Sequence, residues 1–488
     1  MKTGTNAKNS VITNFFWRFL ERCGAQGVTF IVSVALARIL DTEVYGTIAI
    51  VTVFISIMQV FVDSGMGNAL IQKKDADDLD FSSVFFFNIA VCVILYIALF
   101  FASPFIADFY QSPELTDIIR VLGITVIISG IKNVQQAYVT RNMMFKRFFF
   151  STLGGTVGAA IVGIAMAYMG FGVWALVGQM LFNTTIDTAI LWITVKWRPK
   201  CQFSFERLKG LLSFGWKLLV SSLIDTIYTD LRQLVIGKIY TKSDLAQYNQ
   251  GDRFPKLIVT NINTSIDSVL LPTMSKAQDD KELVKKMTRR AITVSTYIMM
   301  PFMAGLAVCA EPLVSLILKD KWLFCVPYLR IFCFTYAFYP IHTANLNAIK
   351  AMGRSDLFLK LEIAKKVVGM IALLATMWIS VMAMAYSLLV TSVISQLINS
   401  GPNRKLINYS YIEQLKDMFP QICISLVMGA VVYFIPYIGL GKLVTLIIQV
   451  VVGALIYIAL SKIFKIESFE YIYGTVKEFM KKRSRKEA

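Results

Sequence analysis

Basic side chains recur inside otherwise apolar segments of this sequence, at a spacing that places them on one face of a helix. Steps of three and four residues define three polar stripes of this kind. The stripes are Arg18, Arg22, Gln26, Thr29 and Ser33; Lys217, Ser221, Asp225, Tyr228 and Arg232; and Asn249, Arg253, Lys256, Thr260, Asn263 and Asp267. A charged side chain facing lipid at a helix centre costs about 2.5–3.5 kcal/mol. We therefore expect the stripes to line a shared aqueous cavity. Internal salt bridges, such as Arg18 with Glu21 or Asp225 with Arg232, are the alternative.

The charge of the stripes indicates which ligand such a cavity would hold. They contain six basic side chains and only two acidic ones, while Glu21, Asp230 and Asp252 lie on neighbouring faces and reduce the excess. Guanidinium groups match the oxygens of phosphate, so an anionic, phosphate-bearing substrate is favoured. A pump for lipophilic cations should instead show carboxylates among aromatic side chains. The predicted headgroup-binding residues are Arg18, Arg22, Gln26, Lys217, Arg232, Arg253 and Lys256, and the candidate ion-coupling acids are Asp225 and Asp267.

Residues for covalent chemistry are scarce. His342 is the single histidine, and the seven cysteines form no CxxC pair, so no metal site is predicted. Trp216 precedes Lys217 and no Ser or Thr follows, which leaves no Walker motif and makes direct use of ATP unexpected. The sequence therefore predicts no catalytic residue and no cofactor, but leaves open coupling to H⁺ or Na⁺. A membrane enzyme, with an acid such as Asp108 or Glu114, remains the rival hypothesis.

The elements that must position these residues are membrane-spanning helices. The chain has 488 residues, of which 56% are apolar and 16% charged, against about 45–50% and 25% in soluble domains. About 20 apolar residues suffice to cross a hydrocarbon core of about 30 Å. Fourteen spans are predicted: 12–37, 44–64, 81–104, 118–139, 148–169, 173–195, 211–237, 247–273, 290–310, 327–349, 358–380, 382–399, 417–437 and 440–462. Pro255, Pro301 and Pro340 lie inside spans and predict kinks.

The distribution of Lys and Arg predicts the orientation of the spans. The loops on the side of both termini hold roughly four times as many basic residues as the opposite loops, as the positive-inside rule requires. Both termini are therefore expected in the cytoplasm. The same bias accounts for the net charge of +18, so a nucleic-acid partner is not predicted.

A weak internal repeat of about 200 residues predicts the domain organisation. Phe16-Trp17-Arg18 opens the first span, and Gly215-Trp216-Lys217 opens the seventh. Two pseudo-symmetric six-helix lobes around a central cavity, followed by two C-terminal helices, explain this repeat. The expected limits are 1–203, 204–403 and 404–488. Beyond Glu467, apolar residues at helical spacing among lysines predict a helix on the inner leaflet, with a solvated tail as the alternative.

Short motifs along almost the whole chain resemble those of the polysaccharide flippases of the MOP superfamily, and among these the Wzx-like exporters most closely. The matching segments are Leu36-Ala37-Arg38-Ile39-Leu40 with Tyr45-Gly46, Asp63-Ser64-Gly65, Arg141-Asn142-Met143-Met144-Phe145-Lys146, Gly172-Val173-Trp174-Ala175-Leu176, Tyr248-Asn249, Leu271-Pro272 and Gly353-Arg354-Ser355-Asp356. Asp41-Thr42-Glu43 departs from the family, which usually has a proline there.

The resemblance implies a multi-pass protein of the bacterial cytoplasmic membrane that translocates polyprenyl-diphosphate-linked oligosaccharides by alternating access. Its implied partners are this lipid-linked substrate, membrane lipids, a polysaccharide polymerase and glycosyltransferases. Related flippases line their cavity with basic residues in the first and eighth spans, and Arg18, Arg22 and Arg253 are similar by position. A multidrug or cation extruder of the same superfamily and a flippase for a cell-wall precursor remain alternatives.

Overall fold

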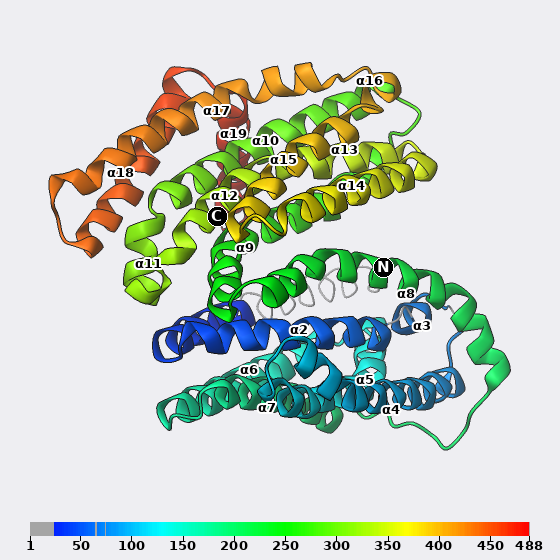
Figure 1. The fold of residues 1–488 in the computed structure, drawn as a ribbon. Coiled ribbons are helices and arrows are strands. Elements are labelled where there is room, and N and C mark those ends of the chain that lie inside the picture. The colour runs from blue at the N-terminus through cyan, green and yellow to red at the C-terminus, as the bar shows by residue number, and fades with distance from the viewer. Residues whose placement is uncertain (1–23, 64–65, 74, 488) are drawn as a thin grey trace. The chain divides into compact units, whose positions relative to one another are not determined.

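The computed structural model describes residues 24–63, 66–73 and 75–487, and all regular structure within these ranges is helical (Figure 1). The chain divides into two compact units. The N-terminal unit ends at Ala246, and the C-terminal unit begins at Gln247. The two predicted arginines of the first span, Arg18 and Arg22, lie outside the described residues.

Two helix pairs and a central helix form the N-terminal unit. Helix α4 packs against α5, α6 against α7, and α2 contacts both α5 and α8. The helices are Gly24–Ile39, α2 Thr42–Val62, α3 Met66–Gln72, α4 Asp78–Phe109, α5 Glu114–Arg141, α6 Phe145–Tyr168, α7 Val173–Thr194, α8 Phe205–Ile239 and the first turn of α9 Lys242–Ser275.

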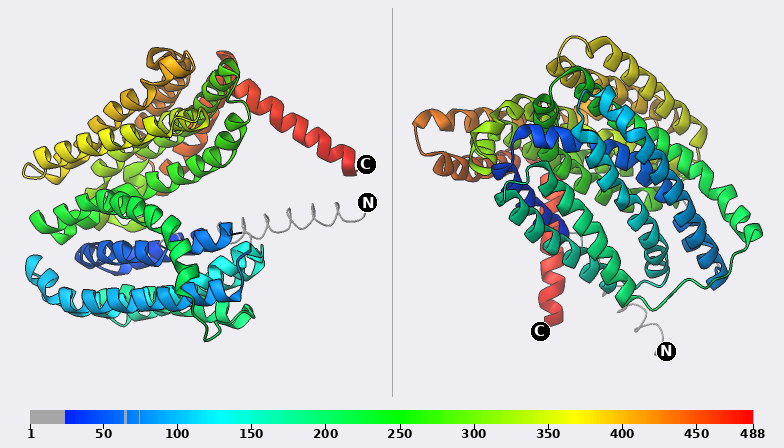
Figure 2. Two further views of the ribbon diagram at one scale, coloured as in Figure 1. Left: turned by 90° about the vertical axis from the view of Figure 1, so that its right-hand side faces the viewer. Right: turned by 60° about the horizontal axis from the view of Figure 1, so that its bottom comes forward.

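Helix α10 is the centre of the C-terminal unit, because α12, α13, α17 and α19 all contact it. This unit contains the remainder of α9, α10 Lys281–Val308, α11 Ala310–Leu318, η1 Asp320–Cys325, α12 Val326–Ala337, α13 Tyr339–Ala351, α14 Ser355–Thr376, α15 Val381–Ser400, α16 Asn403–Leu406, α17 Tyr411–Phe434, η2 Ile435–Ile438, α18 Lys442–Ile463 and α19 Glu467–Glu487. Figure 2 shows α19 leaving the other helices of its unit and ending at the C-terminus.

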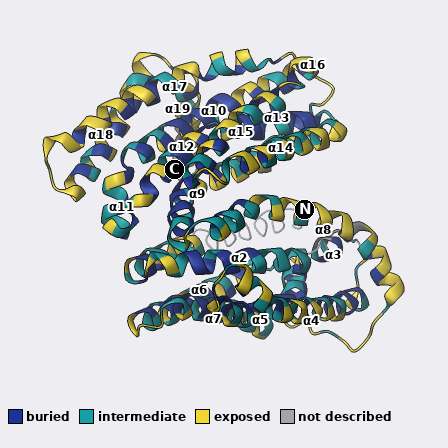
Figure 3. Ribbon diagram, in the orientation of Figure 1, coloured by how far each residue is buried: buried dark blue, intermediate teal, exposed yellow. Residues whose placement is uncertain are grey.

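The protein is a multi-pass membrane protein. Nine helices among the described residues are long and apolar enough to cross a bilayer, or ten if α8, which bends by 49° near its start, counts as one span. Large apolar side chains on their outer faces are exposed, as helices in contact with lipid require; on α18 they include Leu443, Ile447, Val450 and Leu455 (Figure 3).

Of the three prolines expected to kink spans, one divides its span. Helix α9 continues through Pro255 and α10 through Pro301, whereas the predicted span 327–349 divides at Phe338 into α12 and α13. Pro340 then lies in the first turn of α13, where the missing backbone N–H needs no partner.

Helix α8 belongs by its contacts to the N-terminal unit, since it packs against α2, α3 and α4. The repeat in the sequence assigned the same helix to the second lobe. The predicted lobes are defined by internal symmetry, whereas the two units of the structure are defined by contacts. The units therefore do not test the lobe limits 1–203, 204–403 and 404–488, which stay a prediction.

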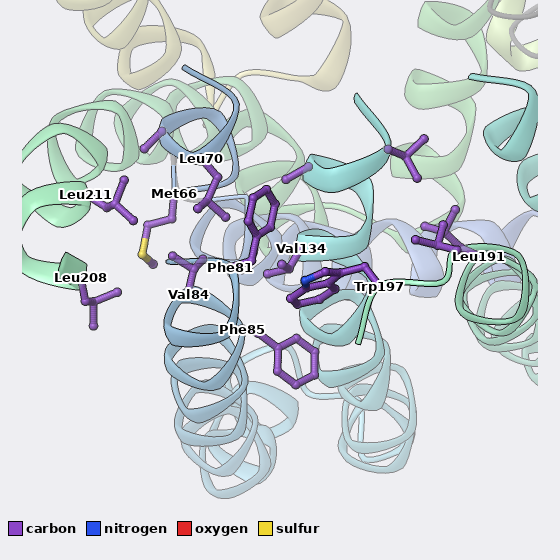
Figure 4. Close-up of a cluster of buried hydrophobic side chains, with 14 of the residues drawn as sticks. Met66, Leu70, Phe81, Val84, Phe85, Val134, Leu191, Trp197, Leu208 and Leu211 are labelled. Atoms are coloured by element: carbon purple, nitrogen blue, oxygen red, sulfur yellow. The ribbon is translucent and has the colours of Figure 1, made fainter. Parts of the chain in front are cut away.

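An aromatic core joins the end of α7 to α4 and α5. Trp197 lies among Phe81, Phe85 and Tyr138, stacked on the last with ring centroids 6.0 Å apart (Figure 4). Its indole N–H donates to Asp78 Oδ1 at 3.2 Å, and Gln135 donates to its carbonyl oxygen at 3.0 Å. Both polar ends of the buried tryptophan are therefore satisfied.

Charged side chains at one end of this unit join α4, the segment after α3, and α8. Asp77 caps α4 through the N–H of Asp80, and this hydrogen bond, with the Arg207 guanidinium 2.7 Å away, lowers the pKa of Asp77. Lys73 donates to Asp80 at 2.7 Å. Arg141, which opens one of the family-like motifs, donates to the carbonyl of Leu70 at 2.7 Å and therefore ties α5 to α3.

The start of α9 lies directly against the start of α2. The hydroxyls of Thr42 and Ser243 are 2.9 Å apart, and Lys242 Nζ lies 2.6 Å from Glu114 Oε1. Gly46 makes this approach feasible, because a Cβ there would lie only 2.5 Å from the carbonyl carbon of Lys242. The missing side chain of Gly46 thus admits the backbone of α9.

Candidate functional site

The described part of the first stripe begins at Gln26, on the helix Gly24–Ile39. Gln26 and Thr29 are exposed, and the Ser33 hydroxyl donates to the carbonyl of Phe30 at 2.7 Å. This stripe therefore presents polar side chains on the surface of an apolar helix. The headgroup role of Arg18, Arg22 and Gln26 stays a prediction.

All five residues of the second stripe lie on α8, and their exposure changes along the helix. Lys217, Ser221 and Asp225 are exposed, Tyr228 is half-buried, and Arg232 is buried with 9% of its surface exposed. The helix thus exposes the two charges Lys217 and Asp225, whereas Arg232 lies in its more buried C-terminal half.

Hydrogen bonds fix the C-terminal half of α8 to its unit. Asp230 accepts a hydrogen bond from Ser56 on α2 at 2.7 Å and another from Gln233 at 3.3 Å. The Tyr110 hydroxyl, at the end of α4, donates to the carbonyl of Leu234 at 3.3 Å. The carboxylate of Asp230 is therefore held within the packing of the unit, and its negative charge still offsets part of the basic excess of the stripe.

The third stripe lies on α9, within the C-terminal unit. Arg253 is half-buried, and Lys256 has 57% of its side chain exposed. Lys256 Nζ lies 3.5 Å from Asp252 Oδ2, and the Tyr336 hydroxyl on α12 donates to the same carboxylate at 2.6 Å. For Lys256 the salt-bridge alternative therefore applies, although its exposure leaves the ammonium able to meet a ligand as well.

Asp267, one of the two candidate coupling acids, is bound to a neighbouring helix. The side-chain N–H of Asn347 on α13 donates to Asp267 Oδ1 at 2.6 Å, and Asn347 is buried with 1% exposed. Asn263, one turn earlier on α9, has a buried Oδ1 that accepts no hydrogen bond from the described residues. The α9 stripe therefore offers both a bound carboxylate and an unused amide acceptor.

The sequence did not identify Tyr336, Asn347 and Ser56, which hold the acids beside the stripes. Asn347 lies in the predicted span 327–349, where a buried amide in an apolar run is a signal in itself. Tyr336 and Ser56 carry no such signal, since tyrosine and serine are common in apolar helices.

Two other lysines within apolar segments belong to ion pairs inside a unit. Lys132 on α5 lies 3.0 Å from Asp187 on α7, with 17% and 16% of the two side chains exposed. Lys365 lies 2.6 Å from Glu362 on α14. These pairs explain why a lysine is tolerated in an apolar helix without any role in binding.

The arrangement offers charges and hydrogen bonds. Within the described ranges, no three His, Cys, Asp or Glu side chains gather as metal ligands. His342 is buried, and its Nδ1 lies 3.0 Å from the Asn399 side-chain nitrogen. The structure places Lys217, Asp225 and Arg232 together on α8 and Arg253, Lys256 and Asp267 together on α9. Whether both sets face one cavity stays a prediction.

Comparisons with known proteins extend these observations. Residues 35–327 match the family described as polysaccharide biosynthesis protein. The chain is 25% identical over 333 residues to the succinoglycan biosynthesis transport protein ExoT of Rhizobium meliloti, covering 68% of this chain and 67% of that protein. It is 24% identical over 365 residues to the lipopolysaccharide biosynthesis protein WzxC of Escherichia coli, covering 73% of each. The fold is similar to that of the lipid II flippase MurJ, with a TM-score of 0.73, 16% identity, and 93% and 98% of the two chains covered.

Proposed function

Because the chain belongs to the polysaccharide biosynthesis protein family, we propose that it is a flippase for polyprenyl-diphosphate-linked oligosaccharide repeat units. It would translocate them across the bacterial cytoplasmic membrane for exopolysaccharide, capsule or O-antigen synthesis. The family match over residues 35–327 carries the proposal. Transport and lipopolysaccharide-synthesis relatives and the MurJ-like fold support it. A multidrug MATE transporter matches the fold with a lower TM-score of 0.60, so the extruder is the weaker alternative.

The proposed topology has fourteen spans in two pseudo-symmetric six-helix lobes, with two further spans at the C-terminus and both termini in the cytoplasm. Nine apolar helices, the bent α8 and the helix Gly24–Ile39 supply eleven of these spans. The other three are α5, α9 and α14, which are long enough to span but more polar. Polar spans are expected where a helix faces a hydrated cavity and not lipid.

In the proposed mechanism, the diphosphate and sugars occupy the cavity while the polyprenyl tail stays in lipid. The basic groups bind the diphosphate, and the exposed Gln26 offers neutral hydrogen bonds for sugar hydroxyls. Rocking of the two halves would then expose the headgroup outside. The diphosphate ligands are proposed to be Arg18, Arg22, Lys217, Arg232, Arg253 and Lys256.

An ion gradient or the membrane potential is proposed to bias this cycle. One elementary charge crossing the membrane gains about 2.3 kcal/mol per 100 mV, enough to bias alternating access strongly. Asp225 is exposed on α8, and Asp267 is exposed on α9 beside Asn347. Binding of H⁺ or Na⁺ at either carboxylate would remove a negative charge beside the basic stripes and tighten their hold on the diphosphate.

The experiment is complementation of a strain that lacks its own flippase for the same repeat unit. Arg22→Ala with Arg253→Ala should reduce polymer export at least tenfold at normal protein levels. The matched control is Lys281→Ala with Lys416→Ala, which removes two exposed positive charges outside the stripes. Full export by the arginine double variant would refute the headgroup role. Protection against lipophilic cations without any polymer export would replace the flippase with the extruder. Polymerases and glycosyltransferases of the same assembly pathway would act as partners.

A further inference from the structure

An apolar groove runs between α9 and α10 in the C-terminal unit, separate from the polar stripe of α9. It encloses about 640 Å³ and is closed at one end by Tyr471 of α19. Ile266 and Leu270 line it from α9, and Met287, Val294 and Ile298 line it from α10. The two helices are joined by the short connection 276–280, and Met274 of α9 packs with Val284 and Ile292 of α10 in one apolar cluster.

The end of the groove nearest this connection carries an uncompensated positive charge. The Arg290 guanidinium lies 4.6 Å from the ring centroid of Tyr471, and both side chains are exposed. No carboxylate among the described residues pairs with Arg290. The adjacent Arg289, by contrast, lies 3.1 Å from Asp417 and 3.4 Å from Glu467. Two neighbouring arginines on α10 therefore differ in one respect: Arg289 is neutralised, and Arg290 is available to an anion.

The length of the groove matches one leaflet of a bilayer. Met287 and Ile298 are 11 residues apart on α10, which is about 17 Å at 1.5 Å per residue. Half of a hydrocarbon core of about 30 Å is similar. Tyrosine is typical of the boundary between headgroups and acyl chains, so Tyr471 places the charged end of the groove at that boundary.

We propose that this groove is a binding site for an anionic phospholipid. One acyl chain lies along Ile266, Leu270, Val294 and Ile298, and the phosphate is held by Arg290 and the Tyr471 hydroxyl. An anionic lipid is favoured over a zwitterionic one because Lys286, one turn before Arg290, is exposed as well. The bound lipid contacts α9, α10 and α19 and therefore attaches the C-terminal helix to its unit.

Native mass spectrometry of the purified full-length protein in detergent tests this site, with phosphatidylglycerol as the probe and phosphatidylcholine as the neutral comparison. Arg290→Gln should weaken retention of phosphatidylglycerol about fivefold, the effect expected of one basic group at an anionic surface, and leave phosphatidylcholine unchanged. Ala291→Phe, which fills the groove but keeps Arg290, should reduce retention of both lipids. Lys416→Gln, an exposed lysine on α17 outside the groove, is the control with the same loss of charge.

Three results would overturn the assignment. The first is unchanged phosphatidylglycerol retention in both Arg290→Gln and Ala291→Phe. The second is an equal loss in Lys416→Gln, which would indicate general surface charge. The third is displacement of phosphatidylglycerol by an equimolar amount of a polyprenyl phosphate, which would make the groove a substrate site. Because none of these measurements uses transport, they stay distinct from failure of the proposed flippase activity.

Discussion

Substitution of Gly46 by alanine tests how closely α2 and α9 approach each other. The new Cβ would lie 2.5 Å from the carbonyl carbon and 2.7 Å from the Cα of Lys242, and the carbonyl oxygen is closer still. Real Cβ contacts stay beyond 3.0 Å, so the two backbones must move apart to admit the methyl group. Backbone atoms cannot rotate away, so the strain falls on the Thr42–Ser243 and Lys242–Glu114 contacts.

We expect Gly46→Ala to destabilise the N-terminal unit by about 1–3 kcal/mol, the usual cost of overpacking. The measurement is thermal unfolding of the purified protein in detergent, followed by tryptophan fluorescence. Gly210→Ala in α8 is the matched control, because nothing lies within 4 Å of a Cβ there. It should leave stability unchanged or raise it by up to about 1 kcal/mol through helix propensity. Equal stability of Gly46→Ala and the unsubstituted protein would refute the close approach.

Three further substitutions test ion pairs and the candidate coupling acid. The hydrogen bond from Lys242 lowers the pKa of Glu114, so Glu114→Gln should reduce stability by at most about 1 kcal/mol at pH 7. The difference should shrink as pH falls below the ordinary glutamate range, because the carboxylate then becomes protonated, and a constant difference across pH would contradict this. The single variant Lys132→Ala should destabilise the protein more than the double variant Lys132→Ala with Asp187→Ala, because it leaves a largely buried carboxylate without its partner. Unfolding by denaturant compares the two variants. The opposite order of stability would exclude a structural ion pair. If the Asp267 carboxylate couples ion binding to transport, Asp267→Asn should abolish the pH dependence of export while protein stability and protein levels stay normal. An unchanged pH profile of export would exclude Asp267 as the coupling acid.

Sequence periodicity was sufficient to locate most helices. The predicted spans 148–169 and 173–195 correspond to α6 Phe145–Tyr168 and α7 Val173–Thr194, with ends only a few residues away. Apolar length and the turn residues between such segments determine these helices locally. The predicted span 327–349 lies within the single apolar span Asp320–Ala351, and its helix is interrupted at Phe338, beside the proline that predicted a kink.

The partners of the stripes could not be predicted in the same way. Tyr336 follows Asp252 by 84 residues, and Ser56 precedes Asp230 by 174, so each contact depends on which helices become neighbours. Helical spacing indicates that residues share a face but not what that face touches. The carboxylate of Asp252 illustrates this limit. Its partner Lys256 lies one turn along the same helix and can be predicted from spacing, whereas its other partner, the Tyr336 hydroxyl, comes from another helix and cannot.

The basic stripes on α8 and α9 are each anchored by hydrogen bonds to their own unit, and this has a consequence for the proposed transport. Helix α8 is held through Asp230 to Ser56, and the described α9 stripe is held through Asp252 to Tyr336 and through Asp267 to Asn347. The charges on α8 therefore move with the N-terminal unit and those on α9 with the C-terminal unit. The proposed alternating access would need each set of charges to keep its geometry within its own unit. The acids beside these two stripes thus hold each stripe rigidly within its own unit.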